Sequence, residues 1–298
     1  MVFPNFLIIG AAKSGTTSLY SYLNQHPQIY MSSVKEPRFF ALEGKEINYQ
    51  GPAKVINQKT INTLEEYESL FDGVQNETAI GEASTLYLYH PKAVKKIKQY
   101  IPQVKLIAIL RDPVKRAFSS YQHLLRDGYE TLSFAAALKA EKERIADNYP
   151  PLWHYQQRGF YYQQLSQYFA EFPAEQIKVY LYEDLIQNSH LMLEDMFGFL
   201  GVEPKFQPDK TQKMNASGSP KNKILHKLIT KDNWLKSAVK GIIPQDLRQN
   251  IYQKVKKSNL QKNNQIPDNI TEQLKETYRA DILQLQELLK RDLSNWLN

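Results

Sequence analysis

Three short apolar runs along the chain alternate with segments of helical periodicity. Continuous apolar character over a few residues is typical of strands in a parallel sheet that is covered on both faces. The predicted strands are Phe6–Ile9, Lys105–Leu110 and Ile177–Tyr182. The helices predicted to follow them are Thr17–Asn24, Pro113–Arg126 and Ser189–Leu200. The alternation predicts the α/β class, with a central parallel sheet flanked by helices.

The character of the chain changes after residue 203. Residues 203–223 are rich in Pro, Lys, Asn, Ser and Gly, and we predict a long loop there. Three helical stretches follow, of which the last is Asp268–Leu293. We therefore predict a single domain over residues 1–298, with an α/β core over 1–203 and a loop and helical C-terminal extension over 204–298.

Composition and charge narrow the class of protein only a little. Hydrophobic residues make up 42% and charged residues 23% of the 298 positions, as in ordinary soluble proteins. The net charge of +7 suits an anionic ligand, although excess lysine is usually a solvated surface. The absence of cysteine excludes disulfides, thiolate catalysis and cysteine-based metal sites. The apolar N-terminal run is too short to span a membrane, so we expect a cytoplasmic protein without a membrane span.

The sequence GAAKSGTTS, which follows the first predicted strand, is the first candidate for chemistry. Gly10 and Gly15 keep the spacing of an NTP-binding loop, but the lysine lies inside the loop, at Lys13. A strand, a small-residue loop and a helix N-terminus together form a cradle for an anion, and predict a P-loop-like sheet. An ordinary strand–turn–helix with hydroxyl caps is the alternative. The candidate ligands of the anion are Lys13, Ser14, Gly15, Thr16, Thr17 and Ser18.

A second anion site is predicted where the strand Lys105–Leu110 ends. Arg111 follows that strand, so it lies at the carboxyl edge of the sheet, where α/β proteins bind ligands. Ser119 lies about two turns into the next helix, and an arginine with a hydroxyl suits a phosphate. Two anion sites on one edge suggest a nucleotide with phosphates at both ends.

These two motifs together resemble those of the sulfotransferases. The match comprises K-x-G-T-T after the first strand and R-D-P-x-x-R-x-x-S-x-Y after a later one. Further stretches are similar to bacterial members and to the heparan sulfate sulfotransferase branch: KEPRFF, GEASTLYLY, GYETLSFAAAL, RGFYYQQL and YEDL. The resemblance covers roughly residues 5–225. It implies that 3′-phosphoadenosine 5′-phosphosulfate (PAPS) is the co-substrate and PAP the product, with the first loop on the phosphosulfate and Arg111 and Ser119 on the 3′-phosphate.

The resemblance also implies roles for the charged residues of KEPRFF. Glu36 would be the general base that accepts the proton of the acceptor hydroxyl, and Lys13 would stabilise the leaving phosphate. Lys35 and Arg38 flank Glu36 and would contact the acceptor. Glu82 is a second candidate carboxylate; the heparan branch has a lysine after it where this chain has Ala83, which puts a polyanionic acceptor in doubt.

Three further residues are weaker candidates. His123 lies four residues after Ser119, on the same helix face, and is an alternative catalytic group. Tyr161 belongs to a stretch that lies near the nucleotide in relatives, and Lys221 to a loop that closes over the 3′-phosphate. No metal-ligand spacing is present in the sequence, and we predict no metal.

Three other functions compete with sulfuryl transfer. A P-loop small-molecule kinase would need a lysine after Gly15 and a metal-holding carboxylate, and the sequence lacks both. A non-catalytic polyanion- or nucleic-acid-binding module is supported by the net charge, but no RNA-binding motif is present. A degenerate member that binds nucleotide without turnover would not need Lys13 and Glu36. The expected partners are PAPS and a hydroxyl-bearing acceptor, and a carbohydrate or a small molecule is the acceptor we favour. Sugar, lipid-linked, polyketide and peptide hydroxyls, and an amine, all fit the sequence.

Overall fold

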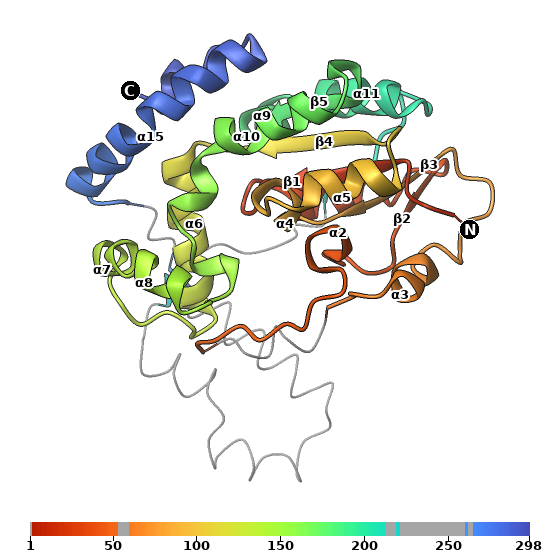
Figure 1. The fold of residues 1–298 in the computed structure, drawn as a ribbon. Helices are drawn as coiled ribbons and strands as arrows, with labels where there is room; N and C mark the ends of the chain where they lie inside the picture. The colour runs from red at the N-terminus through yellow and green to blue at the C-terminus, as the bar shows by residue number, and fades with distance from the viewer. Residues whose placement is uncertain (1, 53–59, 212–218, 221–259, 262–264) are drawn as a thin grey trace, which may run out of the picture.

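A five-stranded parallel sheet forms the centre of the molecule, as a computed structural model shows (Figure 1). The structure describes residues 2–52, 60–211, 219–220, 260–261 and 265–298. The strand order is β2-β3-β1-β4-β5, and every neighbouring pair is parallel. The strands are β1 (Phe6–Gly10), β2 (Ile29–Met31), β3 (Ala79–Ala83), β4 (Lys105–Leu110) and β5 (Ile177–Leu181). The predicted α/β class is confirmed.

Alternate residues of each strand enter two different cores. Phe6 and Ile8 of β1 pack with the first core, under α1 (Thr16–Leu23), α10 (Tyr182–Gln187) and α11 (Ser189–Leu200). Leu7 and Ile9 pack with the second and larger core on the opposite face. The helices of the second face are α2 (Phe39–Leu42), α3 (Leu64–Ser69), α4 (Leu86–Tyr89), α5 (Ala93–Tyr100), α6 (Pro113–Arg126) and α9 (Tyr161–Glu171).

The segment between α6 and α9 forms a small helical lobe beside the sheet, as Figure 1 shows. It contains α7 (Phe134–Lys139), α8 (Glu141–Ala146) and the 3-10 turns η2 (Pro151–Trp153) and η3 (Gln157–Gly159). Further 3-10 turns are η4 (Ala174–Gln176) and η5 (Ser294–Trp296), and the short strands β6 (Ser219–Pro220) and β7 (Leu260–Gln261) form an antiparallel pair.

The long C-terminal helix α15 (Asp268–Leu289) packs against α9 (Figure 1). Asp281 accepts hydrogen bonds from the backbone N–H groups of Tyr162 and Gln163, at 3.0 and 3.2 Å, and so caps the start of α9. The helix was predicted to reach Leu293 but ends four residues earlier. Lys290 adopts a left-handed conformation there, and Leu293 is buried after the turn rather than within the helix.

The predicted strands and helices agree with the structure to within one residue in the core. The predicted strand Lys105–Leu110 and the helices Pro113–Arg126 and Ser189–Leu200 have the observed bounds. The sequence pattern missed β2 and β3; β2 pairs with β3, and β3 pairs with β1. The other two helical stretches predicted after residue 223 lie outside the described residues.

Candidate functional site

The carboxyl ends of β1, β3 and β4 meet at an open cleft with a volume of ≈ 400 Å³. The chain turns toward β2 and β3 after β1, and toward β5 after β4, so the cleft lies where the strand order reverses direction. This is the edge where ligands of open α/β sheets bind. Lys13, Glu36, Arg111, Ser119 and His123, which were predicted from separate motifs, all line the cleft.

The loop after β1 brings its backbone close to α10. Gly15 has a φ of 93°, in the left-handed region, and a Cβ there would lie 2.6 Å from Leu185 Cδ2. A side chain at this position would therefore be both strained and obstructed. Gly15 is also the N-cap of α1 and provides no side-chain cap, so the first N–H groups of the helix are available to an anion. Thr16, Thr17 and Ser18 line the cleft at this helix end.

Lys13 is the cation of the loop. Its backbone carbonyl accepts a hydrogen bond from Arg111 Nη1 at 3.1 Å, which ties the loop after β1 to the end of β4. The pKa of Lys13 is lowered to about 8, first because the side chain is removed from solvent and second because of the nearby positive charge of Arg126. An anion in the cleft would reverse this effect, since it stabilises the charged ammonium group.

Arg111 extends across the cleft from the end of β4. Its guanidinium carbon lies 4.7 Å from the centre of the Tyr182 ring, over the ring face. Its Nε is buried and has no hydrogen-bond partner among the described residues. Ser119 and His123 of α6 also line the cleft. His123 is held by Arg126 and Asp127, with 3.5 Å between His123 Nδ1 and Asp127 Oδ2.

Glu36 presents its carboxylate from the loop between β2 and α2. Oε1 accepts a hydrogen bond of 2.9 Å from the Thr85 hydroxyl, and Oε2 accepts one of 3.1 Å from the Thr85 backbone N–H. The Glu36 backbone has a φ of 62°, and its N–H donates to the Ala83 carbonyl at 2.9 Å. The end of β3 therefore holds both the backbone and the side chain of Glu36.

The cations beside Glu36 keep it ionised. Burial raises the pKa of Glu36, but Lys35, Arg38 and the Thr85 hydrogen bond outweigh burial and lower the pKa below its usual range. Lys35 Nζ lies 3.3 Å from Oε1, and Arg38 Nε lies 3.6 Å from Oε2. The Glu36 side chain nevertheless remains 21% exposed, toward the cleft it lines. Both predicted acceptor-side cations are therefore engaged with the carboxylate.

Three predicted site residues are buried away from the cleft surface. Glu82 is fully buried in β3 and accepts a hydrogen bond from Tyr67, because its side chain points into the core below the cleft. Burial raises its pKa to about 8, so Glu82 is mostly protonated at neutral pH. Tyr161 is also fully buried, and its hydroxyl donates to the Arg111 carbonyl at 2.9 Å. Ser14 of the loop is fully buried, and its hydroxyl has no hydrogen-bond partner among the described residues. Lys221 lies outside the described residues.

Several cleft residues were missed or not chosen from the sequence. Arg158 lines the cleft and donates to the Thr85 carbonyl at 2.9 Å, while burial lowers its pKa to about 10. The motif RGFYYQQL contained it, but the neighbouring Tyr161 was chosen. Tyr182 is the first residue of the quoted motif YEDL. Nothing in the sequence indicated that its ring contacts Arg111. The remaining unpredicted residues of the lining include Tyr22, Tyr49, Thr85, Leu86, Pro150, Pro151, Leu152, Leu185 and Ile186.

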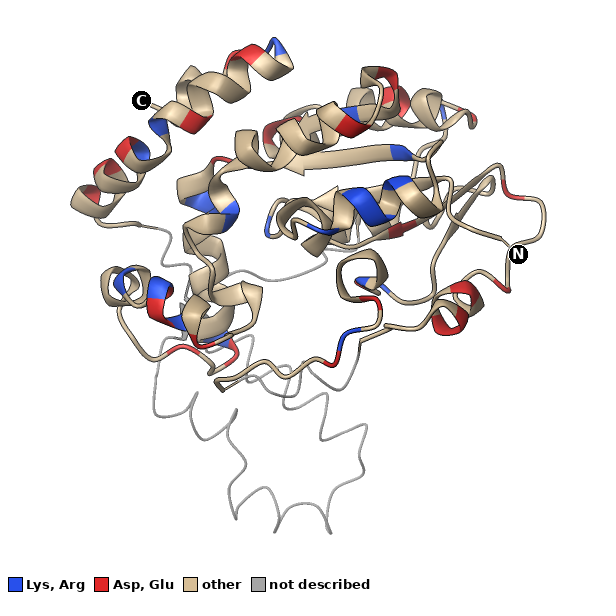
Figure 2. Cartoon of the chain, viewed as in Figure 1, with Lys and Arg blue, Asp and Glu red and all other residues tan. Residues whose placement is uncertain are grey.

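Charged side chains outside the cleft lie on several helices, as Figure 2 shows. Acidic and basic residues are mixed along α8 and α15, and the cations that stand together on α5 lie away from the cleft lining (Figure 2). Within the described ranges, no three His, Asp or Glu side chains are grouped so as to hold a metal ion. No helix in the described part of the chain is long and apolar enough to cross a bilayer.

Comparisons with known proteins agree on one family. A model described as "Sulfotransferase family" matches residues 4–208. A crystal structure of a sulfotransferase from Alicyclobacillus acidocaldarius is 35% identical, covers 100% of both chains and gives a TM-score of 0.78. The sulfotransferase domain of the curacin biosynthetic pathway, 16% identical over 73% of this chain and 82% of that one, has a TM-score of 0.50 and shows the fold alone.

Curated relatives are similar over part of their length. The bifunctional heparan sulfate N-deacetylase/N-sulfotransferase 4 of Mus musculus is 30% identical over 214 residues, which are 68% of this chain and 23% of that protein. The membrane-associated sulfotransferase kil1 of Dictyostelium discoideum is 36% identical over 121 residues, 40% of this chain and 22% of that protein. The chain thus spans less than a quarter of these two relatives.

Proposed function

Because the chain belongs to the sulfotransferase family, we propose that it transfers a sulfuryl group from PAPS to a hydroxyl acceptor, with an amine as the alternative acceptor. The observation that carries this proposal is a single cleft that joins an anion cradle to an ionised carboxylate. The cradle, which we call the donor end, consists of residues 13–18 with Arg111 and Ser119. The acceptor end is the part of the cleft around Glu36.

The donor end fits a nucleotide that is anchored by two anionic groups. The N-terminus of α1 and Lys13 would hold the phosphosulfate, and Arg111 with Ser119 would hold the 3′-phosphate. One buried polar atom of the lining supports this fit, since Arg111 Nε has no hydrogen-bond partner among the described residues. Buried polar atoms normally have a partner, so this atom favours a polar ligand or water nearby.

Glu36 is the proposed general base. Its lowered pKa keeps the carboxylate ionised at neutral pH, so it can accept the proton of an acceptor hydroxyl. The acceptor oxygen then forms a bond to sulfur, while the bond between sulfur and the oxygen of the 5′-phosphate breaks. Glu82 is protonated and buried, which favours Glu36 over Glu82 for this role.

Lys13 is the proposed group that stabilises the leaving phosphate. Negative charge develops on the oxygen between sulfur and phosphorus as their bond breaks, and an ammonium group in a partly buried loop stabilises that charge well. Arg111 fixes the Lys13 backbone through its hydrogen bond, so the two anion sites are built as one unit. His123 is tied to Arg126 and Asp127, which favours an orienting role over proton transfer.

Binding of PAP tests this function directly. At about 100 times its dissociation constant, PAP should raise the free energy of unfolding by about 2.7 kcal/mol, visible as a rise of several degrees in Tm. The effect should not require magnesium. If ATP with magnesium stabilises the protein as much as PAP does, the kinase alternative is favoured instead. If PAP does not shift Tm at any concentration, the proposed function is wrong.

A further inference from the structure

The acceptor end of the cleft has a wall that the proposed chemistry does not use. It is formed by apolar and aromatic side chains from three distant parts of the chain, and we call it the acceptor wall. Leu86 directly follows Thr85, whose hydroxyl and backbone N–H donate to Glu36, and Tyr49 lines the same cleft. The members of the wall are Tyr49, Leu86, Pro150, Pro151 and Leu152.

The segment that carries Tyr49 is hydrogen-bonded to the segment that carries Pro150. The backbone N–H of Gln50 donates to the Asn148 carbonyl at 3.0 Å, and Asn148 Nδ2 donates to Asn48 Oδ1 at 2.9 Å. A Cβ at Gly51 would lie 2.6 Å from the Tyr149 ring, so the two segments are in close contact. The segment that carries Tyr49 therefore lies directly beside the segment that carries Pro150, although about 100 positions separate them.

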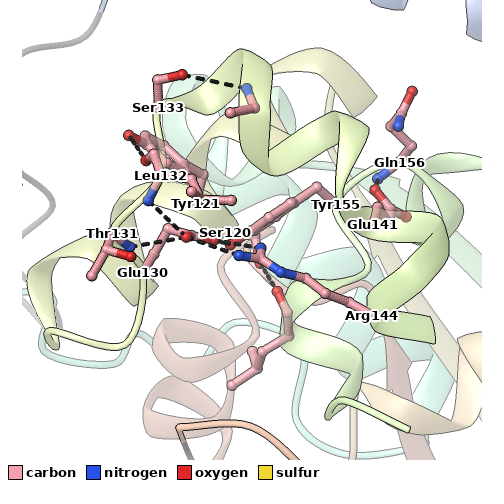
Figure 3. Close-up of polar contacts among 12 residues, drawn as sticks. Ser120, Tyr121, Glu130, Thr131, Leu132, Ser133, Glu141, Arg144, Tyr155 and Gln156 are labelled. Atoms are coloured by element: carbon pink, nitrogen blue, oxygen red, sulfur yellow. Dashed lines mark hydrogen bonds and ion pairs between the residues drawn. The ribbon is translucent and has the colours of Figure 1, made fainter. Parts of the chain in front are cut away.

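A buried ion pair holds the second segment in place. Glu130 is 3% exposed, and its two oxygens accept hydrogen bonds of 2.6 and 3.1 Å from Arg144 (Figure 3). The Tyr155 hydroxyl donates to Glu130 at 2.7 Å, and two backbone N–H groups, of Thr131 and Leu132, donate to it as well. A bidentate arginine–carboxylate pair with its remaining lone pairs satisfied is a rigid support.

Other hydrogen bonds anchor the residues that follow Pro151. Ser120 of α6 donates to the Leu152 carbonyl at 3.1 Å, next to the cleft residue Ser119. Glu141 accepts a hydrogen bond from the backbone N–H of Gln156 at 2.7 Å, as Figure 3 shows, and one from that of Gln157 at 2.9 Å. The part of the wall formed by Pro150, Pro151 and Leu152 is therefore fixed within the folded lobe.

The charges of the cleft are consistent with an uncharged acceptor. In the part of the chain that the structure describes, the lining has five Lys or Arg side chains (Lys13, Lys35, Arg38, Arg111 and Arg158) and one carboxylate, Glu36. A 3′-phosphate carries about −1.5 to −2 charge, and a phosphosulfate adds roughly as much again. PAPS would therefore balance this lining, and Lys35 and Arg38 already contact Glu36.

From the apolar wall and this charge balance, we infer that the acceptor is an uncharged alcohol with an apolar body, which lies against the acceptor wall while its hydroxyl faces Glu36. The inference rests on the proposed sulfuryl transfer and adds the class of acceptor. Proline and tyrosine faces bind an apolar ring or chain by burying its surface, whereas an anionic sugar chain would find no unengaged cation among the described residues at this end.

Turnover with radiolabelled PAPS tests the acceptor class. The neutral probe is 2-naphthol, and the anionic probe is a de-N-acetylated heparosan hexasaccharide of the kind that an N-sulfotransferase would accept. We expect kcat/KM for 2-naphthol to exceed that for the hexasaccharide by at least about tenfold. A tenfold ratio corresponds to about 1.4 kcal/mol, and burial of an aromatic ring against the acceptor wall contributes more than this. Binding of PAP is measured in parallel with the same protein.

Variants of the wall test its role. Tyr49→Ala should raise KM for 2-naphthol by about three- to tenfold, while Tyr49→Phe keeps the ring and should retain binding. Glu130→Gln loosens the ion pair and should raise the same KM without changing kcat at saturation. Neither change should alter the PAP dissociation constant, which also reports that the variant is folded. Leu283→Ala, at a side chain of α15 that is 45% exposed and lies outside the cleft lining, is the matched control.

The possible results separate this inference from the proposed function. If PAP does not bind, the proposed function fails, and the inference fails with it. If PAP binds and the hexasaccharide is the better acceptor, the function stands and the inference is overturned. The inference is also overturned if 2-naphthol fails to bind the PAP complex up to its solubility limit, or if Tyr49→Ala leaves its KM unchanged.

Discussion

The donor end and the acceptor end of the cleft are built in different ways. The donor end comes from two short stretches, each of which follows a strand directly, so its geometry is set by a few neighbouring residues. The acceptor end combines a loop held by β3 with a wall taken from residues 49, 86 and 150–152. Local motifs therefore define the donor end, whereas long-range packing defines the acceptor end.

Replacing Glu36 should separate the two ends most clearly. In Glu36→Gln the acceptor hydroxyl loses its base, and we expect kcat to fall by about 100- to 10,000-fold. Affinity for PAP should remain within about twofold of the parent, because the donor end is intact. Steady-state kinetics measures kcat, and calorimetric titration measures the dissociation constant of PAP. Full activity in Glu36→Gln, with loss of activity in Glu82→Gln, would show that the base had been wrongly assigned.

Replacing Lys13 should damage the donor end and stabilise the empty protein. Lys13→Met should lower kcat/KM for PAPS by about 100- to 1,000-fold, since the developing charge loses its cation. The pKa of Lys13 is lowered to about 8, so the folded protein disfavours its charge. Below pH 8 both the folded and the unfolded lysine are protonated, and this unfavourable term, on the order of 3 kcal/mol, is fully present. It decreases as the pH rises from about 8 toward 10.5.

Thermal melts of the ligand-free proteins test whether the charge of Lys13 destabilises the folded state. Lys13→Met should have the higher Tm at pH 7, and the difference should shrink at pH 9.5. A lower Tm for Lys13→Met at pH 7 would mean that the lysine has a stabilising partner in the empty protein.

Arg111→Lys should weaken the donor end without changing its charge. Lysine can neither donate through a planar fork nor lie flat on the Tyr182 ring as the guanidinium does. We expect PAP to bind about 10- to 100-fold more weakly, with little change in kcat at saturating PAPS. Equal PAP affinity in Arg111→Lys would exclude a bidentate contact to a phosphate.

Glu82→Gln should have the smallest effect on turnover and a clear effect on stability. The folded state raises the pKa of Glu82 to about 8, so it holds a proton that the unfolded chain releases above its ordinary pKa. The free energy of unfolding should therefore decrease as the pH rises from about 5 to 8, by at most about 1.4 kcal/mol per pH unit from this group. Glutamine mimics the protonated acid, so denaturant titrations of Glu82→Gln should show a flatter dependence on pH. An unchanged slope would contradict a protonated Glu82.

The contrast between local motifs and long-range packing also explains which parts of the fold could be predicted from the sequence. The strands β1, β4 and β5 were identified because apolar residues predominate in each of them. Strand β3 was missed because Gly81 and Glu82 interrupt its pattern, yet both fit the structure. A Cβ at Gly81 would lie 2.2 Å from the Phe6 ring, and Glu82 is buried beside Tyr67.

The candidate site shows a similar limit. Lys13, Arg111 and Glu36 belong to short motifs that carry their own geometry, and the structure brings all three to one cleft. Tyr49 and Pro150 come from segments about 100 positions apart, which are joined across the fold by the hydrogen bond between Gln50 and Asn148. No periodicity in either segment indicates such a contact, so the acceptor wall could be found only from the folded chain.

The left-handed backbone at Glu36 and Arg38 has a consequence for how the reaction would proceed. Both residues have positive φ values, of 62° and 63°, and neither is glycine. Such conformations cost about 1–3 kcal/mol each and persist only where surrounding contacts enforce them. Folding meets that cost once, before any substrate arrives. The carboxylate and its flanking guanidinium are thus preorganised, and little rearrangement of dipoles would accompany each turnover.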